Sequence, residues 1–278
     1  MTYRIAAPPA MRDPVRYARR RRWLYRSLAW GFPVALVALW QLAASREWID
    51  TRLFPSPSDI VTAGRELVDE GTLQEQVWIS LQRVWWGLFW GSVTGVAVGF
   101  ACGAVRVVRA TLESTLSALY TVPKLALLPM LLLIFGSGES PKVILIAITV
   151  FFFMWLSAMA AVMEVSDGYR EAARAFRVSH WQMFRHVLFP ATLPQILVGL
   201  RLSSGVAVLM MVGAEFAQGN DGIGKFIFQS WTLFLADRMY IGIVAVALMG
   251  LAFSMAITAL TRVLVRWAPR DRDQVRAR

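Results

Sequence analysis

The segment Gly219–Phe226, which reads GNDGIGKF, has the glycine and lysine spacing of a phosphate-binding loop. Such a loop, G-x-x-x-x-G-K-[ST], follows a strand, opens a helix and uses a hydroxyl after the lysine to bind Mg²⁺. Here Phe226 stands where the hydroxyl is required, and an apolar run long enough to cross a membrane precedes the segment. We therefore predict that this segment binds no ATP and forms a tight loop, with Ile223 and Phe226 turned toward neighbouring helices.

Residues that hold metals or attack substrates are scarce. Both histidines, His180 and His186, lie in one polar loop, and Cys102 is the only cysteine. One cysteine allows neither an intrachain disulfide nor a cysteine-based metal site. The apolar runs contain no nucleophile–base set and no cluster of metal ligands, which argues against an enzyme embedded in a membrane.

Ionisable residues interrupt the apolar runs, where a charge exposed to lipid would be costly. Glu215 follows the apolar stretch LMMVGA near the end of one run. Its carboxylate fits a pore or an outer gate, and alternatively an ion pair with Arg238 or Lys225. The candidates for a solute pathway or gate are three ionisable residues and two methionines of the same stretch as Glu215: Lys124, Arg201, Glu215, Met210 and Met211.

The cations among these candidates leave alternatives open. Lys124 would either reach the inner membrane surface or face the interior of a helix bundle. Arg201 fits an inner gate or a structural ion pair, and Arg83, at the start of another apolar run, fits an interfacial anchor. If these cations line a pathway, an anionic or zwitterionic solute would suit it.

The composition indicates an integral membrane protein. The chain has 278 residues, of which 57% are hydrophobic and 17% are charged. Soluble domains typically have about 45–50% apolar and about 25% charged residues. The net charge of +11 could indicate nucleic-acid binding, but the arginines cluster between long apolar runs rather than on one face.

The apolar runs predict an all-α protein with six transmembrane helices. A bilayer-spanning helix needs about 20 mostly apolar residues. Six segments qualify, at about 27–45, 82–105, 114–136, 142–164, 195–217 and 239–265. Pro123 and Pro129 each remove a backbone donor from the third span, which predicts an interruption that neighbouring helices or a water-lined cavity must satisfy.

The basic residues predict the orientation of the spans. The segments outside the spans lie alternately on the two sides of the membrane, and those on the side of the termini carry 20 basic residues against seven on the other side. Basic residues are more frequent on the cytoplasmic side, so both termini are expected to be cytoplasmic. The chain then divides into a basic arm at 1–26, a transmembrane domain at 27–268 and a tail at 269–278. In the acidic outer segment 46–83, Ser58 is expected to cap a helix from about Asp59 to Glu70.

The cytoplasmic loop at about 165–194 is too polar to span and too patterned to be a simple connection. Its first part, Tyr169–Arg177, reads as a short helix with a small apolar face. A second helix is expected to start at Ser179, which has the spacing of a capping box with Gln182, and to end before Pro190. Two short helices of this kind suit docking into a partner's groove; the alternative is an amphipathic hairpin on the inner leaflet.

The EAA sequence at 171–173, followed by Pro190 and by Leu193-Pro194, resembles the loop of ABC importer permeases. The resemblance extends over roughly residues 50–268. SLQRVWWGL at 80–88, YTVPKLALLPMLLLIFGSGES at 120–140 and GLRLSSGVAVLMMVGAEF at 199–216 are similar to the nitrate/sulfonate/taurine-type subfamily. The resemblance implies the type I ABC importer permease fold.

The same resemblance implies that this loop couples the chain to a cytoplasmic ATPase. The residues implied in that contact are Glu171, Ala172, Ala173, Ala175, Phe176 and Arg177. Arg177 departs from the family, which usually has glycine there. Glycine readily adopts the positive φ of a tight turn, whereas arginine does so only with strain. The turn between the two short helices is therefore expected to be less sharp, or the first helix is expected to run on to Val178. Arg177 could also contact an acidic patch on the ATPase.

Partners are implied by the family and by the number of loops. One loop per chain implies a homodimer above two ABC ATPase subunits, which would bind ATP and Mg²⁺, together with a periplasmic or lipid-anchored binding protein. This chain itself is expected to bind no cofactor, no metal and no nucleic acid, and to catalyse no reaction. The expected location is a bacterial inner membrane, in contact with lipid.

The implied activity is import by alternating access, in which ATP-driven closure of the ATPases opens the pathway outward. The implied solute is sulfonate-, taurine- or nitrate-like, and alternatively a heterocyclic or aromatic compound. The competing interpretation is an ATP-independent channel or secondary transporter, which would need no cytoplasmic docking loop.

Overall fold

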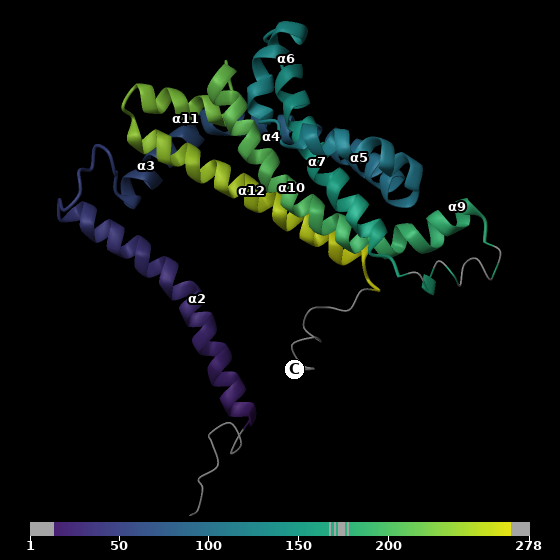
Figure 1. Ribbon diagram of the computed structural model, residues 1–278. Helices are drawn as coiled ribbons and strands as arrows, with labels where there is room; N and C mark the ends of the chain where they lie inside the picture. The colour runs from purple at the N-terminus through teal and green to yellow at the C-terminus, as the bar shows by residue number, and fades with distance from the viewer. Residues whose placement is uncertain (1–13, 167, 170, 172–175, 177, 268–278) are drawn as a thin grey trace, which may run out of the picture. The chain divides into compact units, whose positions relative to one another are not determined.

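The computed structural model describes residues 14–166, 168–169, 171, 176 and 178–267, and these residues form helices and turns without a strand. The expected all-α class is thus confirmed for this part of the chain. Within the described residues, five helices are long and apolar enough to cross a membrane, and six if a bent pair counts as one span. The contacts divide the chain into two units, Met1–Arg65 and Glu66–Arg278, which are described separately (Figure 1).

The first unit contains α2 (Pro14–Ser45) and the start of α3 (Pro57–Asp69). The Gln41 side chain joins them, because its amide oxygen accepts from the Ser58 N–H at 3.1 Å and its amide nitrogen donates to the Ser58 hydroxyl at 3.2 Å. The expected cap was wrong by two residues. Ser56 accepts from the Asp59 N–H, and Asp59 accepts from the Ser56 N–H in return, so Ser56 and Asp59 form the reciprocal cap.

In the second unit, α4 (Thr72–Ala104) packs closely against α7 (Ser140–Met163) through a row of glycines. A Cβ atom added to any of these glycines would lie 2.4–2.6 Å from an atom of α7. Backbones approach this closely in membrane helices only where side chains are small. Their spacing of four residues keeps them on one face of α4: Gly87, Gly91, Gly95, Gly99 and Gly103.

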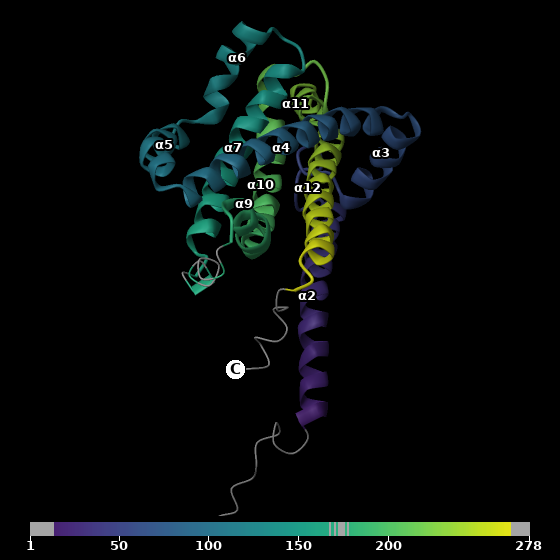
Figure 2. The same ribbon diagram turned by 90° about the vertical axis from the view of Figure 1, so that its right-hand side faces the viewer.

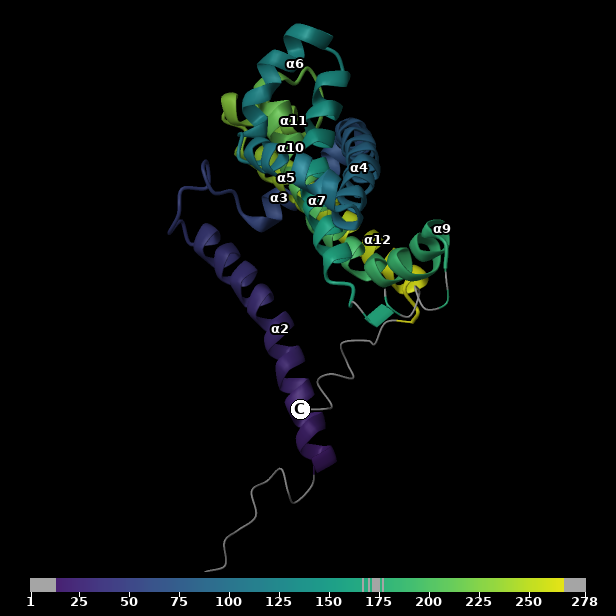
Figure 3. The same cartoon turned by 45° about the vertical axis from the view of Figure 1, so that its right-hand side comes forward.

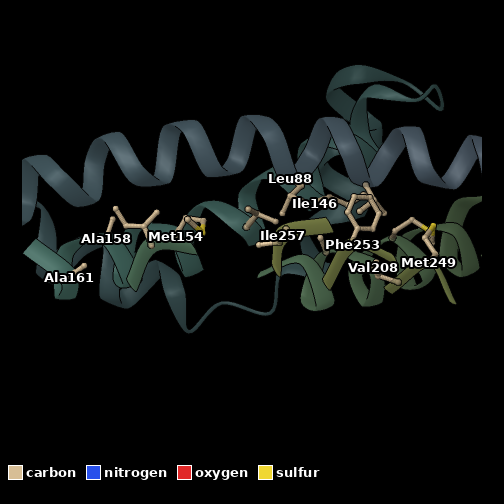
Figure 4. Packing of buried hydrophobic residues seen from close by; sticks show 14 of the residues in the cluster. Leu88, Ile146, Met154, Ala158, Ala161, Val208, Met249, Phe253 and Ile257 are labelled. Carbon is tan, nitrogen blue, oxygen red and sulfur yellow. The ribbon is translucent and has the colours of Figure 1, made fainter. Parts of the chain in front are cut away.

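The rest of the second unit is built around α10 (Phe189–Gln218), which lies between α7 and α12 (Ala236–Leu264) in Figure 2. The short helix α11 (Ile223–Thr232) connects α10 to α12. Gly199 of α10 approaches Ser157 of α7, and Gly242 of α12 approaches Ile227 of α11, each too closely for a Cβ. Buried side chains of α4, α7, α10 and α12 fill the space between these helices (Figure 4).

The third expected span is interrupted, as its prolines predicted, but it also bends sharply. It consists of α5 (Arg106–Tyr120), a 3-10 turn η1 (Lys124–Leu127) and α6 (Leu128–Phe135), with a bend of 89° at the break. Pro123 precedes η1, and Pro129 lies in the first turn of α6, where the missing N–H needs no partner. α5 has no buried residue.

The helix that starts after Ser179 confirms the capping box but does not end before Pro190. Ser179 N–H donates to Gln182 Oε1 at 3.0 Å, and Gln182 N–H donates to Ser179 Oγ at 3.3 Å. α9 (His180–Met183) then continues through a π-helical turn, η2 (Phe184–Leu188), into α10. Phe189 N–H reaches back five residues to Phe184 O. The wider turn brings Pro190 into the first turn of α10, where a proline is tolerated.

Candidate functional site

Arg83, on α4, is the centre of a buried ionic cluster. Its side chain is 1% exposed, and its guanidinium donates to carboxylates from three other segments. Nη2 lies 2.6 Å from Glu139 Oε1, and Nη1 lies 2.7 Å from Glu215 Oε1. Asp221 accepts through its carboxylate and, at 3.0 Å, through its backbone carbonyl. The expected role of Arg83 as an interfacial anchor was therefore wrong.

Glu215, near the end of α10, is completely buried and fully hydrogen-bonded. Besides Arg83, its oxygens accept from the Ser80 hydroxyl, which lies 2.8 and 3.0 Å from them, and from the Gly224 N–H at 2.7 Å. The ion-pair partner is thus Arg83 rather than Arg238 or Lys225. Every one of these contacts is a donor directed at a carboxylate oxygen, so the buried side chain has hydrogen-bond partners for both of its oxygens.

The loop from Gly219 to Gly222 is the tight loop expected from the sequence. Gly222 has a φ of 101°, and a Cβ there would lie 2.5 Å from Glu215. Its N–H donates to Gln76 Oε1 at 2.6 Å, and the Ile223 N–H donates to Ser80 Oγ at 2.8 Å. Ile223 is buried, as expected. The amides at the start of α11 are therefore occupied by side chains of α4 and α10 and offer no phosphate cradle.

Lys142 completes the cluster from the first turn of α7. Its buried ammonium lies 3.3 Å from Glu139 Oε1 and 3.8 Å from Asp221 Oδ1. We call these five residues the Arg83 cluster: Arg83, Glu139, Lys142, Glu215 and Asp221. The cluster contains two cations and three carboxylates. The hydrogen bond from Arg83, assisted by the charges of Arg83 and Lys142, lowers the pKa of Glu139 below its usual value.

The other pathway candidates lie elsewhere in the unit. Lys124 folds back at the α5–η1 break, where its ammonium donates to the carbonyls of Leu119 and Tyr120 and lies 4.7 Å from the Phe152 ring centre. Arg201 is exposed, and its Nε donates to Ser254 Oγ at 2.9 Å. Both therefore interact with neighbouring helices rather than with Glu215.

The two methionines before Glu215 differ in exposure. Met211 is completely buried in the core of the second unit. Met210 is only partly buried, and it packs between two groups of core residues. Within this chain, Met210 is therefore the more accessible of the two.

Of the implied coupling residues, Glu171 and Phe176 are described, and both are exposed; the Phe176 side chain is 83% exposed. The remaining four, Ala172, Ala173, Ala175 and Arg177, lie outside the described residues. An exposed phenylalanine side chain of this size is available for contact with another surface. The loop and the Arg83 cluster lie at opposite ends of α10, as the positions of α9 and α11 show (Figures 1 and 3).

Replacing Glu215 with glutamine is expected to lower the free energy of unfolding by about 2–3 kcal/mol, because the new amide NH₂ would face at least one of the donors around it. The measurement is chemical unfolding of the purified chain in detergent. Glu164→Gln, a change at an exposed carboxylate at the end of α7, is the control. A Glu215→Gln protein as stable as the wild type would contradict a Glu215 side chain whose two oxygens are surrounded by donors. Unchanged uptake by a stable variant would remove Glu215 from the solute pathway.

Comparison with known proteins adds a family and a fold. Residues 91–269 match the family described as the binding-protein-dependent transport system inner membrane component. The aliphatic sulfonates transport permease SsuC of Escherichia coli is 34% identical over 90% of this chain and 95% of its own length. The taurine transport permease TauC of Escherichia coli is 31% identical with the same coverage, and the nitrate import permease NrtB of Synechocystis is 29% identical over 83% of this chain and 86% of its own.

Solved structures share the fold. An inward-facing structure of the MetNI methionine ABC transporter aligns with a TM-score of 0.61 at 23% identity, over 68% of this chain and 94% of that one. An amino acid ABC transporter aligns with a TM-score of 0.56 at 16% identity, over 73% and 97% of the two chains. The helical arrangement described above is thus one found in transporter subunits.

Proposed function

Because this chain belongs to the family of binding-protein-dependent transport system inner membrane components, we propose that two copies of it form the translocation pathway of an ATP-driven importer. The chain is a membrane permease for a small solute, and its relatives carry sulfonates, taurine and nitrate. The observation that supports the proposal most directly is its 34% identity to a sulfonate permease over nearly the whole of both chains.

We infer that both termini face the cytoplasm. The support is the distribution of basic residues, with 20 on one side of the spans and seven on the other. With this orientation, the Arg83 cluster and the Gly219–Gly222 loop lie at the outer end of the second unit. The loop with Glu171 and Phe176 lies at the inner end, where ATP is available.

The proposed coupling places this inner loop in a groove of a separate ATPase subunit, which would bind ATP and Mg²⁺ and carry out the hydrolysis. Phe176 supports this placement, because its exposed ring would gain burial in an apolar groove of a partner. A binding protein on the outer side would deliver the solute. Closure of the ATPases would open the pathway outward, and hydrolysis would reset it.

The proposed solute is a small organic or inorganic anion or zwitterion of the sulfonate, taurine or nitrate type. The support comes from three relatives that are named as sulfonate, taurine and nitrate permeases. A heterocyclic or aromatic compound is the alternative. A panel of such compounds, tested by thermal shift on the external binding protein, identifies the solute.

Phe176→Asp is expected to abolish co-purification of this chain with its ATPase subunit, because a charge would enter an apolar contact. The experiment co-expresses both subunits, isolates the complex in detergent and measures the ATPase-to-permease ratio. Phe234→Asp is the matched control, since Phe234 is 86% exposed in the turn before α12, at the other end of the second unit.

A complex that forms equally well with Phe176→Asp would remove Phe176 from the contact. A wild-type chain that isolates without any ATPase, and transports without ATP, would instead support a channel or a secondary transporter. The first outcome rejects only the role of Phe176, whereas the second rejects the importer function itself.

A further inference from the structure

The contacts of the Arg83 cluster separate it into a fixed part and a detachable part. Arg83, Glu139 and Lys142 belong to α4 and to the start of α7, which the glycine row holds together. Glu215 and Asp221 reach the cluster from the end of α10 and from the loop that follows it. Movement of that loop relative to α4 and α7 must therefore break the contacts of Asp221, whereas the contacts of Glu215 with α4 break only if the end of α10 moves.

The two carboxylates differ in how tightly they are held. Glu215 is 0% exposed and is bonded to Ser80, Arg83 and the Gly224 N–H. The Asp221 side chain is 42% exposed, and its contacts in the cluster are with Arg83 and Lys142. Water can replace the partners of an exposed carboxylate but not those of a buried one. Asp221 is thus the contact that separates first.

The charges of the cluster lead to the same conclusion. With Asp221 present there are two cations and three carboxylates, an excess of one negative charge. Without Asp221, Arg83 and Lys142 balance Glu139 and Glu215. Departure of Asp221 therefore leaves no uncompensated buried charge, whereas departure of Glu215 would carry a buried carboxylate away from its donors.

The backbone beside Asp221 permits such a movement. Gly222 has a φ of 101°, in a region that glycine adopts without steric penalty. It is the residue between Asp221 and the buried Ile223, and its N–H donates to Gln76. The middle of the loop is thus held by the partly exposed Asp221 carboxylate together with two backbone hydrogen bonds, from Arg83 to the Asp221 carbonyl and from the Gly222 N–H to Gln76.

We propose that Asp221 is a latch: it fastens the Gly219–Gly222 loop to Arg83 and Lys142 in the resting protein and releases this loop when the pathway opens outward. The Arg83–Glu215 pair remains closed throughout and holds α10 and α11 in place. The role of the latch in transport rests on the proposed importer function, whereas its existence at rest does not.

The first experiment tests the latch at rest. Spin labels are attached to Ser140→Cys and Asn220→Cys, two exposed neighbours of the cluster, in a Cys102→Ala background that removes the only native cysteine. Dipolar broadening is expected in the doubly labelled protein and is expected to weaken when Asp221→Asn is added. Singly labelled proteins show how much of the broadening arises between different copies of the chain. Glu113→Gln is the control substitution, because it removes a carboxylate 4.0 Å from Arg109, outside the Arg83 cluster.

Two results would overturn the latch. One is broadening that is the same with and without Asp221→Asn. The other is a loss of stability in Asp221→Asn as large as that in Glu215→Gln, which would make Asp221 a structural pair rather than a detachable one.

The second experiment tests release during transport. In the assembled complex with its ATPase, ATP and vanadate are expected to weaken the broadening, and Asp221→Asn is expected to raise ATP hydrolysis several-fold in the absence of the binding protein. Broadening that persists in the trapped complex would overturn release. A wild-type complex that never hydrolyses ATP would count against the importer function, while the resting spectra still decide whether the latch exists.

Discussion

Replacing Arg83 with glutamine is expected to destabilise the folded chain by about 3–5 kcal/mol, because it leaves the buried Glu215 carboxylate without its cation. The same change removes donors from Glu139 and Asp221, so three segments lose a common partner. Chemical unfolding in detergent measures the loss, and a reduced yield of membrane-inserted protein would accompany it.

The matched control is Arg109→Gln, because Arg109 pairs with an exposed Glu113 at 4.0 Å. Exposed pairs of this kind contribute about 0–1 kcal/mol. Arg83→Lys is expected to restore part of the stability, since lysine keeps the charge but its single nitrogen replaces the three nitrogens with which Arg83 contacts the three carboxylates. An Arg83→Gln protein as stable as the Arg109→Gln control would contradict the central role of Arg83.

Replacing Gly95 with leucine is expected to separate α4 from α7 and to lower the free energy of unfolding by about 3 kcal/mol, the upper end for overpacking. Even a Cβ at this position would lie 2.6 Å from the Phe151 carbonyl oxygen, a backbone atom that cannot rotate away. The measurement is again chemical unfolding, complemented by disulfide trapping between cysteines introduced on the two helices.

Gly205→Leu is the control for this prediction. Gly205 lies on α10 and has no atom within 4 Å of the Cβ that a substitution would add. Equal stability of the Gly95→Leu and Gly205→Leu proteins would contradict the close approach of α4 and α7.

The sequence predicted those features that depend on local composition. Long apolar runs indicated the spans, Pro123 indicated the break in the third one, and the spacing of Ser179 and Gln182 indicated their reciprocal cap. These signals lie within one helix or one turn. The continuation through Pro190 was missed because the π-helical turn before it has no distinctive spacing in the sequence.

The candidate site was predicted only in part. Glu215 drew attention because a carboxylate in an apolar run needs compensation, but its partner could not be chosen from the sequence. Arg83 and Glu215 are 132 residues apart, and the nearer cations Lys225 and Arg238 were equally plausible. Glu139 and Lys142 looked like ordinary residues before a helix, since nothing local showed that Lys142 would be buried. The coupling residues remain a prediction from the family resemblance.

The order of the Arg83 contacts along the chain has a consequence for how the protein is made. Arg83 leaves the ribosome before any of its partners, and Glu139 follows 56 residues later, Glu215 132 residues later and Asp221 138 residues later. Glu139 can therefore neutralise Arg83 once α7 pairs with α4, before Glu215 and Asp221 reach the cluster. The first counter-ion of Arg83 thus lies directly before α7, the helix that packs on the glycine row of α4, and Glu215 joins an ion pair that has already formed.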